Sequence, residues 1–348
     1  MNKVIVGVIG AGRIGKVHLD NITTRLPNIR IKYVCDLLIE TDAEMRKFVQ
    51  ERVSEDCILT TDYHVVTSDP EVQAIMCLVA TNAHVEVCLA AIAAKKHIFC
   101  EKPVAMEISE TKMLLEESQK AGVLFQVGFN RRFDHNFKTI RDAVAEGKIG
   151  RPTMIHVISR DPTYDIGYIR RSIEEGGMFV DMTIHDFDMV QYVAGPEDPI
   201  VEVFAWGAAL VAPEDIGSLG DVDTAVLTLK TKSGVLATID NTRKAVYGYD
   251  QRLEAVGTKG CISCDNDRPT TCRMMVDDLP TQEDRIKWWF MERYPEAFIA
   301  EEREFFKLVA KGEGVPPVTI QDMLRAMNVA NAANESLKTG LPVKVPQI

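Results

Sequence analysis

Three features are missing from this sequence, and each absence argues against a class of protein. No apolar run approaches the roughly 20 residues that a membrane-spanning helix needs, so we expect no membrane association. Positive charge is in deficit, with 40 Lys and Arg against 51 Asp and Glu and a formal net charge of −11. Because a phosphate backbone demands a basic surface, we expect no nucleic-acid partner. No His/Cys cluster has zinc-ligand spacing, so we expect no metal site.

The eight cysteines are scattered, without the spacing of a disulfide framework. They indicate a reducing compartment, and the strand-like segment that begins at Lys3 leaves no room for a signal peptide. We therefore expect a cytoplasmic protein. Cys261 and Cys264 lie three residues apart. Because a strand would point them to opposite faces, a metal or redox site there is not favoured.

The strongest local signal is a glycine-rich turn between a strand and a helix. Residues 3–10 form a near-continuous apolar run, typical of a parallel strand covered on both faces. The turn that follows reads Gly10-Ala11-Gly12-Arg13-Ile14-Gly15 and opens a helical segment. Gly10 would permit the tight turn, Gly12 the approach of a pyrophosphate, and Gly15 close helix–strand packing. The sequence therefore predicts that residues 10–15 bind a dinucleotide.

The choice of dinucleotide depends on the residue that ends the second strand. This strand, residues 29–35, is followed by Asp36, about twenty residues after the glycine turn. A carboxylate there would accept hydrogen bonds from the ribose hydroxyls and repel a 2′-phosphate. Leu37 and Leu38 supply no arginine to receive such a phosphate. We therefore predict NAD rather than NADP; a glycine turn without any nucleotide is the alternative.

The alternation of strands and helices continues to residue 128. Apolar strand-like segments at 74–80, 97–100 and 123–128 enclose helical segments at 82–94 and 109–121. Strands and helices that alternate at this spacing predict βαβ units and a parallel sheet.

Polar residues follow two of these strands. Thr81 and Asn82 follow the strand at 74–80, and Glu101 and Lys102 follow the next one. Because the carboxyl ends of parallel strands form the ligand-binding edge of a sheet, we expect these four residues at the cofactor site. The position of Lys102, rather than its type, makes it a candidate for catalysis.

The pattern changes after the loop at 147–152. Beyond it, short segments with period-2 alternation and short connections predict an antiparallel sheet, with a hairpin turn at 232–234. The length of 348 residues also exceeds one ordinary domain. We predict an α/β protein with a Rossmann domain at 1–128 and an α+β domain at 129–348. Its C-terminal helix could pack back on the first domain.

A second group of polar residues lies within 176–194, where two glycines precede an apolar-periodic run. In a continuous helix, Asp181, His185 and Asp188 would share one face at positions i, i+4 and i+7. Histidine exchanges protons near neutral pH, and a carboxylate one turn away can stabilise its charged form. A solvated helix face would show the same spacing. The dinucleotide turn and Lys102 favour a catalytic site.

Together these motifs resemble the glucose–fructose oxidoreductase/inositol dehydrogenase family of NAD(P)-dependent oxidoreductases, along nearly the whole chain. The stretches that carry the resemblance are 10–15, 101–103, 128–134 and 176–188. Residues 181–188 are most similar to the inositol 2-dehydrogenase branch. The resemblance implies a Rossmann domain, then a domain with a large, open, mainly antiparallel sheet. It also implies a homotetramer assembled through that sheet.

The resemblance further implies roles for single residues. Lys102, Asp181 and His185 would form the catalytic set. The candidate substrate contacts are Asp188 and, with a weaker match to the family, Arg132, Arg160 and Tyr249.

The reaction that the resemblance implies is the NAD-dependent oxidation of a secondary alcohol on a small neutral cyclic polyol. The substrate expected first is myo-inositol, which would give 2-keto-inositol. His185 would be the base, Lys102 would stabilise the developing alkoxide, and Asp181 would support the charge on His185. Three alternatives stay open: a dehydrogenase of scyllo-inositol, another inositol isomer or an aldose; a non-catalytic NAD-binding regulator; and an enzyme that uses NAD redox chemistry to hydrolyse or isomerise a glycoside. A regulator would be expected to have lost one of the three catalytic residues.

Overall fold

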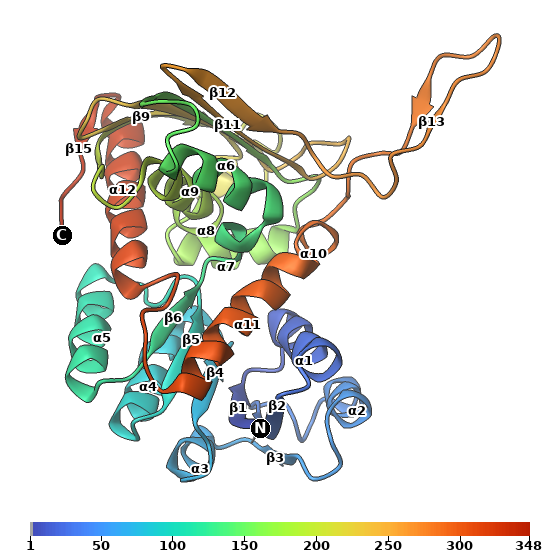
Figure 1. Ribbon diagram of the computed structural model, residues 1–348, viewed down its shortest axis with the longest axis vertical. Coiled ribbons are helices and arrows are strands. Elements are labelled where there is room, and N and C mark those ends of the chain that lie inside the picture. Colours follow the sequence, from blue (N-terminus) through green and yellow to red (C-terminus); the bar gives the residue numbers. More distant parts are fainter. Residues whose placement is uncertain (1–2) are drawn as a thin grey trace. The chain divides into compact units, whose positions relative to one another are not determined.

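A computed structural model describes residues 3–348 (Figure 1). The described chain divides into two units, each with its own sheet. One unit comprises the residues up to Asn130 together with Glu296–Leu324. The other comprises Arg131–Pro295 together with Arg325–Ile348.

The first unit contains a six-stranded sheet in the order β3-β2-β1-β4-β5-β6, in which all neighbouring strands are parallel. The strands are β1 (Val4–Ile9), β2 (Ile29–Cys35), β3 (Ile58–Thr60), β4 (Ala74–Cys77), β5 (His97–Glu101) and β6 (Phe125–Gly128). The helices between them are α1 (Arg13–Arg25), α2 (Ala43–Arg52), α3 (Tyr63–Ser68), α4 (Thr81–Ala93) and α5 (Ile108–Ala121). The predicted parallel sheet is confirmed. The elements α2, β3 and α3 were not predicted, because the segment between Asp36 and Ala74 contains few apolar runs.

A helix from far along the chain completes the core of this unit. Helix α11 (Pro295–Lys311) buries Ile299, Phe305 and Val309 in the same apolar cluster as Val6 and Phe99 of the sheet. The first unit is therefore closed by a helix that begins 167 residues after the end of its last strand, at Pro295 against Gly128. This placement also carries the acidic residues of α11 into its interior.

The second unit contains a seven-stranded sheet in the order β12-β11-β7-β10-β9-β8-β15. The strands are β7 (Pro152–Arg160), β8 (Ile200–Ala208), β9 (Thr224–Thr231), β10 (Leu236–Thr242), β11 (Asp250–Gly257), β12 (Gly260–Cys264) and β15 (Val343–Lys344). Neighbours pair antiparallel except β7 and β10, which run parallel. The predicted, mainly antiparallel sheet is thus confirmed. The hairpin turn between β9 and β10 contains Gly234 at φ +95°, as a tight turn requires.

The two faces of this sheet differ in what covers them. Residues at odd positions of β7, β9 and β10 are buried beneath helices, which include α6 (His135–Ala145), α9 (Ile184–Ala194) and α12 (Ile320–Thr339). Even positions lie on the open face, where Met154, Trp206, Val226 and Leu236 are exposed. A strand alternates its side chains between faces, so this pattern follows directly from the period of two.

The helix expected after the two glycines, over 178–194, is interrupted. Helix α8 (Met178–Asp181) ends where Met182 and Thr183 turn the backbone, and α9 begins at Ile184. The hydroxyl of the buried Thr183 donates to the side-chain oxygen of Asn241 on β10 at 2.7 Å. The same hydroxyl also donates to the Met178 carbonyl at 3.4 Å, and the amides of Met182 and Thr183 both bond to that one carbonyl, so the regular i to i−4 ladder of a helix is interrupted there.

The remaining elements lie around the second sheet. They are the 3₁₀ turns at Asn130–Phe133 and Gly217–Leu219, α7 (Ile166–Glu174), α10 (Phe290–Arg293) and the strands β13 (Arg273–Met274) and β14 (Gln282–Glu283). The β13–β14 hairpin extends away from its unit as a narrow arm (Figure 1). Within residues 3–348, no helix combines the length and the apolar character that crossing a bilayer would require.

Candidate active site

The glycine turn of the first unit has the geometry of a phosphate-binding loop. Gly10 adopts φ +103°, and a Cβ there would lie 2.4 Å from the carbonyl oxygen of Leu78. A Cβ on Gly15 would lie 2.3 Å from the carbonyl oxygen of Gly10, so the start of α1 packs tightly on the turn. Around Gly12, by contrast, the space is open. The backbone at Gly12 can therefore be approached closely, at the N-terminus of a helix whose amides favour an anion.

Asp36 connects the end of β2 to this turn. Its Oδ2 accepts the amide hydrogen of Ala11 at 2.8 Å, and its Oδ1 accepts that of Leu38 at 2.9 Å. Arg13 and Ile14 form the first turn of α1, with Arg13 exposed. The residues expected at 10–15 and at 36 therefore lie together, and they fit a dinucleotide with its phosphates at the helix and its ribose at Asp36.

The other expected cofactor residues follow β4 and β5, which neighbour β1 in the same parallel sheet. Thr81 is buried at the start of α4, and Asn82 beside it is exposed. Glu101 ends β5 and Lys102 follows it. The side chain of His84, on α4, bridges these loops: Nδ1 lies 2.8 Å from the Pro103 carbonyl oxygen and Nε2 lies 3.1 Å from that of Val79.

The second unit contains the other expected catalytic residues. Asp181, at the end of α8, accepts a hydrogen bond from the hydroxyl of Tyr168 at 2.5 Å and one from Nη1 of Arg243 at 3.2 Å. His185 lies in the first turn of α9 and is half-buried. Neither Tyr168 nor Arg243 was predicted from the sequence. Two donors on one carboxylate hold it in a fixed orientation beside the histidine's helix.

Asp161 lies close to Arg243, and so to the group formed by Asp181, Tyr168 and Arg243, because β7 and β10 pair in parallel. Asp161 and Arg243 each follow one of these strands, and the Asp161 amide donates to the Thr242 carbonyl at 2.9 Å. Burial raises the pKa of Asp161 to about 6, against the opposing attraction of Arg243. A carboxyl group that titrates close to neutral pH in a charged cluster is a common feature of functional sites. Each of the two residues directly follows a strand, but the sequence did not reveal that these two strands, β7 and β10, pair in parallel.

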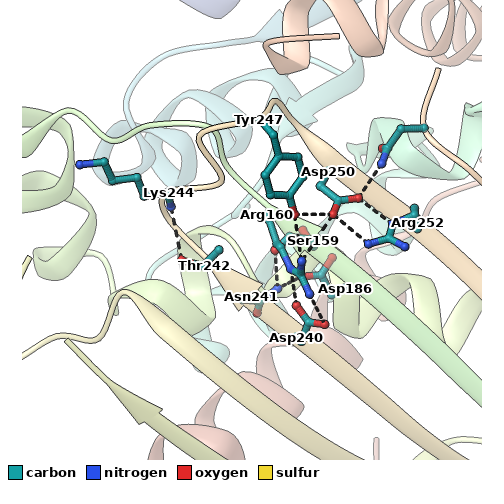
Figure 2. Close-up of polar contacts among 11 residues, drawn as sticks. Ser159, Arg160, Asp186, Asp240, Asn241, Thr242, Lys244, Tyr247, Asp250 and Arg252 are labelled. Atoms are coloured by element: carbon teal, nitrogen blue, oxygen red, sulfur yellow. Dashed lines mark hydrogen bonds and ion pairs between the residues drawn. The ribbon is translucent and has the colours of Figure 1, made fainter. Parts of the chain in front are cut away.

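A buried polar network joins Asp186 of α9 to the sheet, and Figure 2 shows Ser159, Asp186 and Asn241 of this network. Nη1 of Arg131 lies 2.6 Å from Oδ1 of Asp186, and the side-chain amide of Asn241 donates to Oδ2 of Asp186 at 2.8 Å. Arg131 also donates to the hydroxyl oxygens of Ser159 and Tyr249, at 3.2 and 3.4 Å. Burial raises the pKa of Asp186, and the Arg131 guanidinium opposes that rise. The network ties the residue next to His185 to the sheet.

Arg132 and Asp188, both expected as substrate contacts, are bonded to each other. Nε of Arg132 lies 2.9 Å from Oδ2 of Asp188, and Nη2 lies 2.5 Å from Oδ1. Both residues are buried. Such a bidentate pair fixes the orientation of both planar groups.

Arg160 lies on the open face of the sheet, because it alternates with the buried Ser159 along β7. Its guanidinium pairs with Asp240 at 2.6 and 2.8 Å and donates to the Tyr247 hydroxyl at 2.9 Å (Figure 2). The same hydroxyl donates to Asp250 at 2.8 Å. Arg160 therefore belongs to a different set of contacts from those of Arg131. The structure brings Asp181, Arg132 and Asp188 into the helical layer with His185, places Arg160 apart from it, and places Lys102 in the other unit.

The comparison with known families agrees with this arrangement. Residues 4–129 match the family model of the oxidoreductase family with an NAD-binding Rossmann fold, and residues 137–263 match that of the GFO/IDH/MocA C-terminal domain. The dinucleotide turn and the acid at the end of β2 are the NAD-binding arrangement of a Rossmann domain, and the family whose model matches that domain is one of oxidoreductases. The chain belongs to the Gfo/Idh/MocA family of oxidoreductases, as the resemblance in its sequence indicated.

Similar proteins span the whole chain. It is 43% identical to the uncharacterized oxidoreductase YrbE of Bacillus subtilis, over 99% of this chain and 97% of that protein. It is 42% identical to the myo-inositol 2-dehydrogenase of Thermotoga maritima, over 99% of each. The crystal structure of a probable dehydrogenase from Thermotoga maritima has a TM-score of 0.91 and 41% identity, covering 98% of each chain. The predicted fold, NAD cofactor and dehydrogenase class are confirmed.

Proposed function

We propose that this protein oxidises myo-inositol to 2-keto-inositol with NAD. The observation that carries the choice of substrate is the full-length similarity to a myo-inositol 2-dehydrogenase, at 42% identity. The residues of the site support it, because a polyol requires several hydrogen-bonding groups that are fixed in place. Asp181, Tyr168, Arg243 and Asp161 form such a group in the second unit.

The reaction removes a hydride and a proton from one secondary alcohol. NAD, when bound, supplies the acceptor for the hydride. His185 accepts the hydroxyl proton, because an imidazole titrates near the working pH. Lys102 hydrogen-bonds the same oxygen and stabilises the negative charge that develops on it. Asp181 stabilises the charge that His185 acquires. The alcohol carbon becomes a carbonyl, and one proton is released.

Arg243 is the residue that we add to the site. Its side chain is only 2% exposed, and its Nε and Nη2 atoms are buried without a hydrogen-bond partner among residues 3–348. Its Nη1 is held by Asp181. A guanidinium presents donors in a rigid fork, and unused buried donors are costly. We assign these two donors to the ring hydroxyls of the substrate.

The remaining expected contacts have different tasks in this proposal. Arg132 and Asp188 satisfy one another, so the pair orients α9 and thereby His185. Tyr249 acts through Arg131, to which its hydroxyl is bonded. Arg160, on the open face of the sheet, shapes the end of β7 that leads into Asp161. We propose a direct substrate contact for none of these four.

We further propose that copies of this chain assemble through the open face of the second sheet into a tetramer. Trp206 and Val226 are register partners on that face, and they are 64% and 51% exposed. Leu236 and Met154 pair in the same way. Exposed apolar patches on a sheet are costly in water and favour an interface. The eight cysteines are all free thiols, which suits a cytoplasmic location.

A substrate panel tests the function. NADH formation is measured with myo-inositol, scyllo-inositol, D-chiro-inositol, glucose and xylose, using the wild type and Lys102→Met. We expect myo-inositol to give the highest kcat/KM and the variant to lose turnover. Turnover of a sugar but of no cyclitol would make the protein an aldose dehydrogenase. No NADH with any of them, despite NAD binding, would favour a regulator or an enzyme of glycosides. Near-normal activity of Lys102→Met would remove the lysine from the site.

A further inference from the structure

A buried histidine in the first unit lies between two carboxylates. His18 is on α1 and is fully buried. Its Nδ1 lies 2.6 Å from Oε1 of Glu302 on α11, and its Nε2 lies 3.1 Å from Oε1 of Glu101 at the end of β5. Asn21, one turn along α1, donates to the same oxygen of Glu302 at 3.2 Å. Three elements far apart in the sequence therefore meet at one imidazole.

Two ionised partners are both satisfied only by a ring that carries two protons. A neutral imidazole has one N–H and could donate to only one carboxylate, which would leave the other facing a lone pair. Burial lowers the pKa of His18, but the hydrogen bonds to Glu101 and Glu302 outweigh it and raise the pKa to about 10. Burial raises the pKa of Glu301 and of Glu302, both on α11; Glu101 adds to the rise at Glu301, and the hydrogen bond from His18 opposes it at Glu302. Phe99 and Phe298 contact the ring edge-on, at 5.3 and 5.7 Å between centroids.

The Glu101 carboxylate in turn binds the next residue of the chain. Its Oε2 accepts the backbone amide hydrogen of Lys102, with 3.2 Å between nitrogen and oxygen. The carboxylate also packs against Gly128, its register neighbour on β6, where a Cβ would come within 2.9 Å of it. The glycine leaves the space that the carboxylate occupies. Glu101 is therefore held by His18 on one side and holds the backbone of Lys102 with its other oxygen.

We propose that His18 is a positioning residue for the turn that carries Lys102. As an imidazolium anchored by Glu302, it fixes the Glu101 carboxylate, and that carboxylate fixes the amide of Lys102. The catalytic consequence of this arrangement rests on the proposed function, because Lys102 acts on the substrate only if that function is correct. The role of His18 goes beyond the proposed function, because it gives helix α11 a part in catalysis. Misplacement of a reacting group by about 1 Å can cost about 100-fold in rate, so the effect of losing this support should be large.

Three variants separate this role from simple packing. His18→Gln keeps one donor but cannot carry charge. Glu302→Gln keeps an acceptor but removes the charge that stabilises the imidazolium. Ile22→Val, at an equally buried position one turn along α1, removes only a methylene-sized contact and is the matched control. Each variant is purified as the full chain, and its affinity for NADH is measured by fluorescence titration.

Two readouts do not depend on turnover. In protein labelled with ¹⁵N-histidine, we expect the His18 ring to show two protonated nitrogens at pH 8 in the wild type and in Ile22→Val. Hydrogen exchange of the Lys102 amide should be at least about tenfold faster in His18→Gln than in either of these. A neutral His18 at pH 8, or an unchanged exchange rate, would overturn the proposal. Both readouts remain decisive even if the protein turns over no cyclitol, in which case only the proposed function fails.

The third readout is catalytic. We expect His18→Gln to lower kcat with myo-inositol by about 10- to 100-fold while NADH affinity stays within a few-fold. In Glu302→Gln the groups facing His18 are Glu101 from β5 and Glu301 from α11, so its pKa should fall. Turnover of this variant should then decline at a lower alkaline pH than that of the wild type. Ile22→Val should keep the wild-type profile. If the profiles of Glu302→Gln and the wild type superimpose, His18 does not support the lysine.

Discussion

Arg132 and Asp188 form a buried ion pair whose two bonds align a guanidinium with a carboxylate at 2.9 and 2.5 Å. Removing one partner leaves an uncompensated buried charge. We expect Arg132→Met to lower the free energy of unfolding by about 3–5 kcal/mol, measured by urea denaturation. The double variant Arg132→Met with Asp188→Leu should be more stable than either single one. If Arg132→Met lowers the free energy of unfolding by less than about 1 kcal/mol, the ion pair does not hold α9 in place.

The role of His185 as the base predicts a specific kinetic change. His185→Ala should reduce kcat with myo-inositol by about 10²–10⁴-fold, the usual contribution of a general base. NADH affinity, measured by fluorescence, should be nearly unchanged, because the glycine turn lies in the other unit. Turnover within a few-fold of the wild type would place the base elsewhere.

Arg243 is predicted to recognise the substrate. Arg243→Met keeps much of the side-chain volume but removes the two buried donors and the contact with Asp181. We expect kcat/KM for myo-inositol to fall by about 10- to 150-fold for each of these donors that binds the substrate, because each unmade charged hydrogen bond costs about 1.5–3 kcal/mol. Circular dichroism and thermal unfolding check that the variant folds. A loss confined to stability, with kcat/KM retained, would make Arg243 purely structural.

Asp36 is predicted to select NAD against NADP. Its carboxylate lies beside the glycine turn, bonded to the Ala11 amide, where a 2′-phosphate would meet negative charge. At equal concentrations of the two cofactors, the wild type should prefer NAD. Asp36→Asn should narrow that preference mainly by improving kcat/KM with NADP. A wild-type preference for NADP would contradict the role given to Asp36.

The His18 cluster predicts how stability depends on pH. The folded pKa of about 10 lies above the ordinary value of about 6.5, so the charged ring stabilises the folded state. This contribution is fully present below about pH 6.5 and is lost as the pH rises through about 10. The difference in unfolding free energy between the wild type and His18→Gln should therefore shrink from pH 6 to pH 10. The difference for Ile22→Val should stay constant, and a constant difference for His18→Gln would contradict the assignment.

Much of the first unit could be predicted because its signals are local. The glycine turn, the acid after β2 and the alternation of apolar strands with helices are each written in short windows of sequence. The same holds for the alternating strands of the second unit, whose burial pattern follows from the period of two. The short strand β3 escaped prediction because three residues carry too little pattern.

The helix at 176–194 shows where local reasoning stops. Its apolar periodicity is continuous, yet α8 ends at Asp181 and α9 begins at Ile184, and Thr183 between them bonds to Asn241, some sixty residues away. The parallel pairing of β7 with β10 was equally invisible, and it alone brings Asp161 next to Arg243. Neither feature has a periodic signature, because each joins segments that are far apart in the chain.

By itself the sequence determined the class of the protein, its cofactor loop and the types of residue that could carry the chemistry, since these depend on spacing over a turn or a strand. Only the tertiary structure decided how those residues are held: Arg132 by Asp188, Asp181 by Tyr168 and Arg243, and Glu101 by a histidine that α11 anchors. The reason is physical. A buried charge is stable only beside its partner, and the fold chooses that partner without regard to distance along the chain.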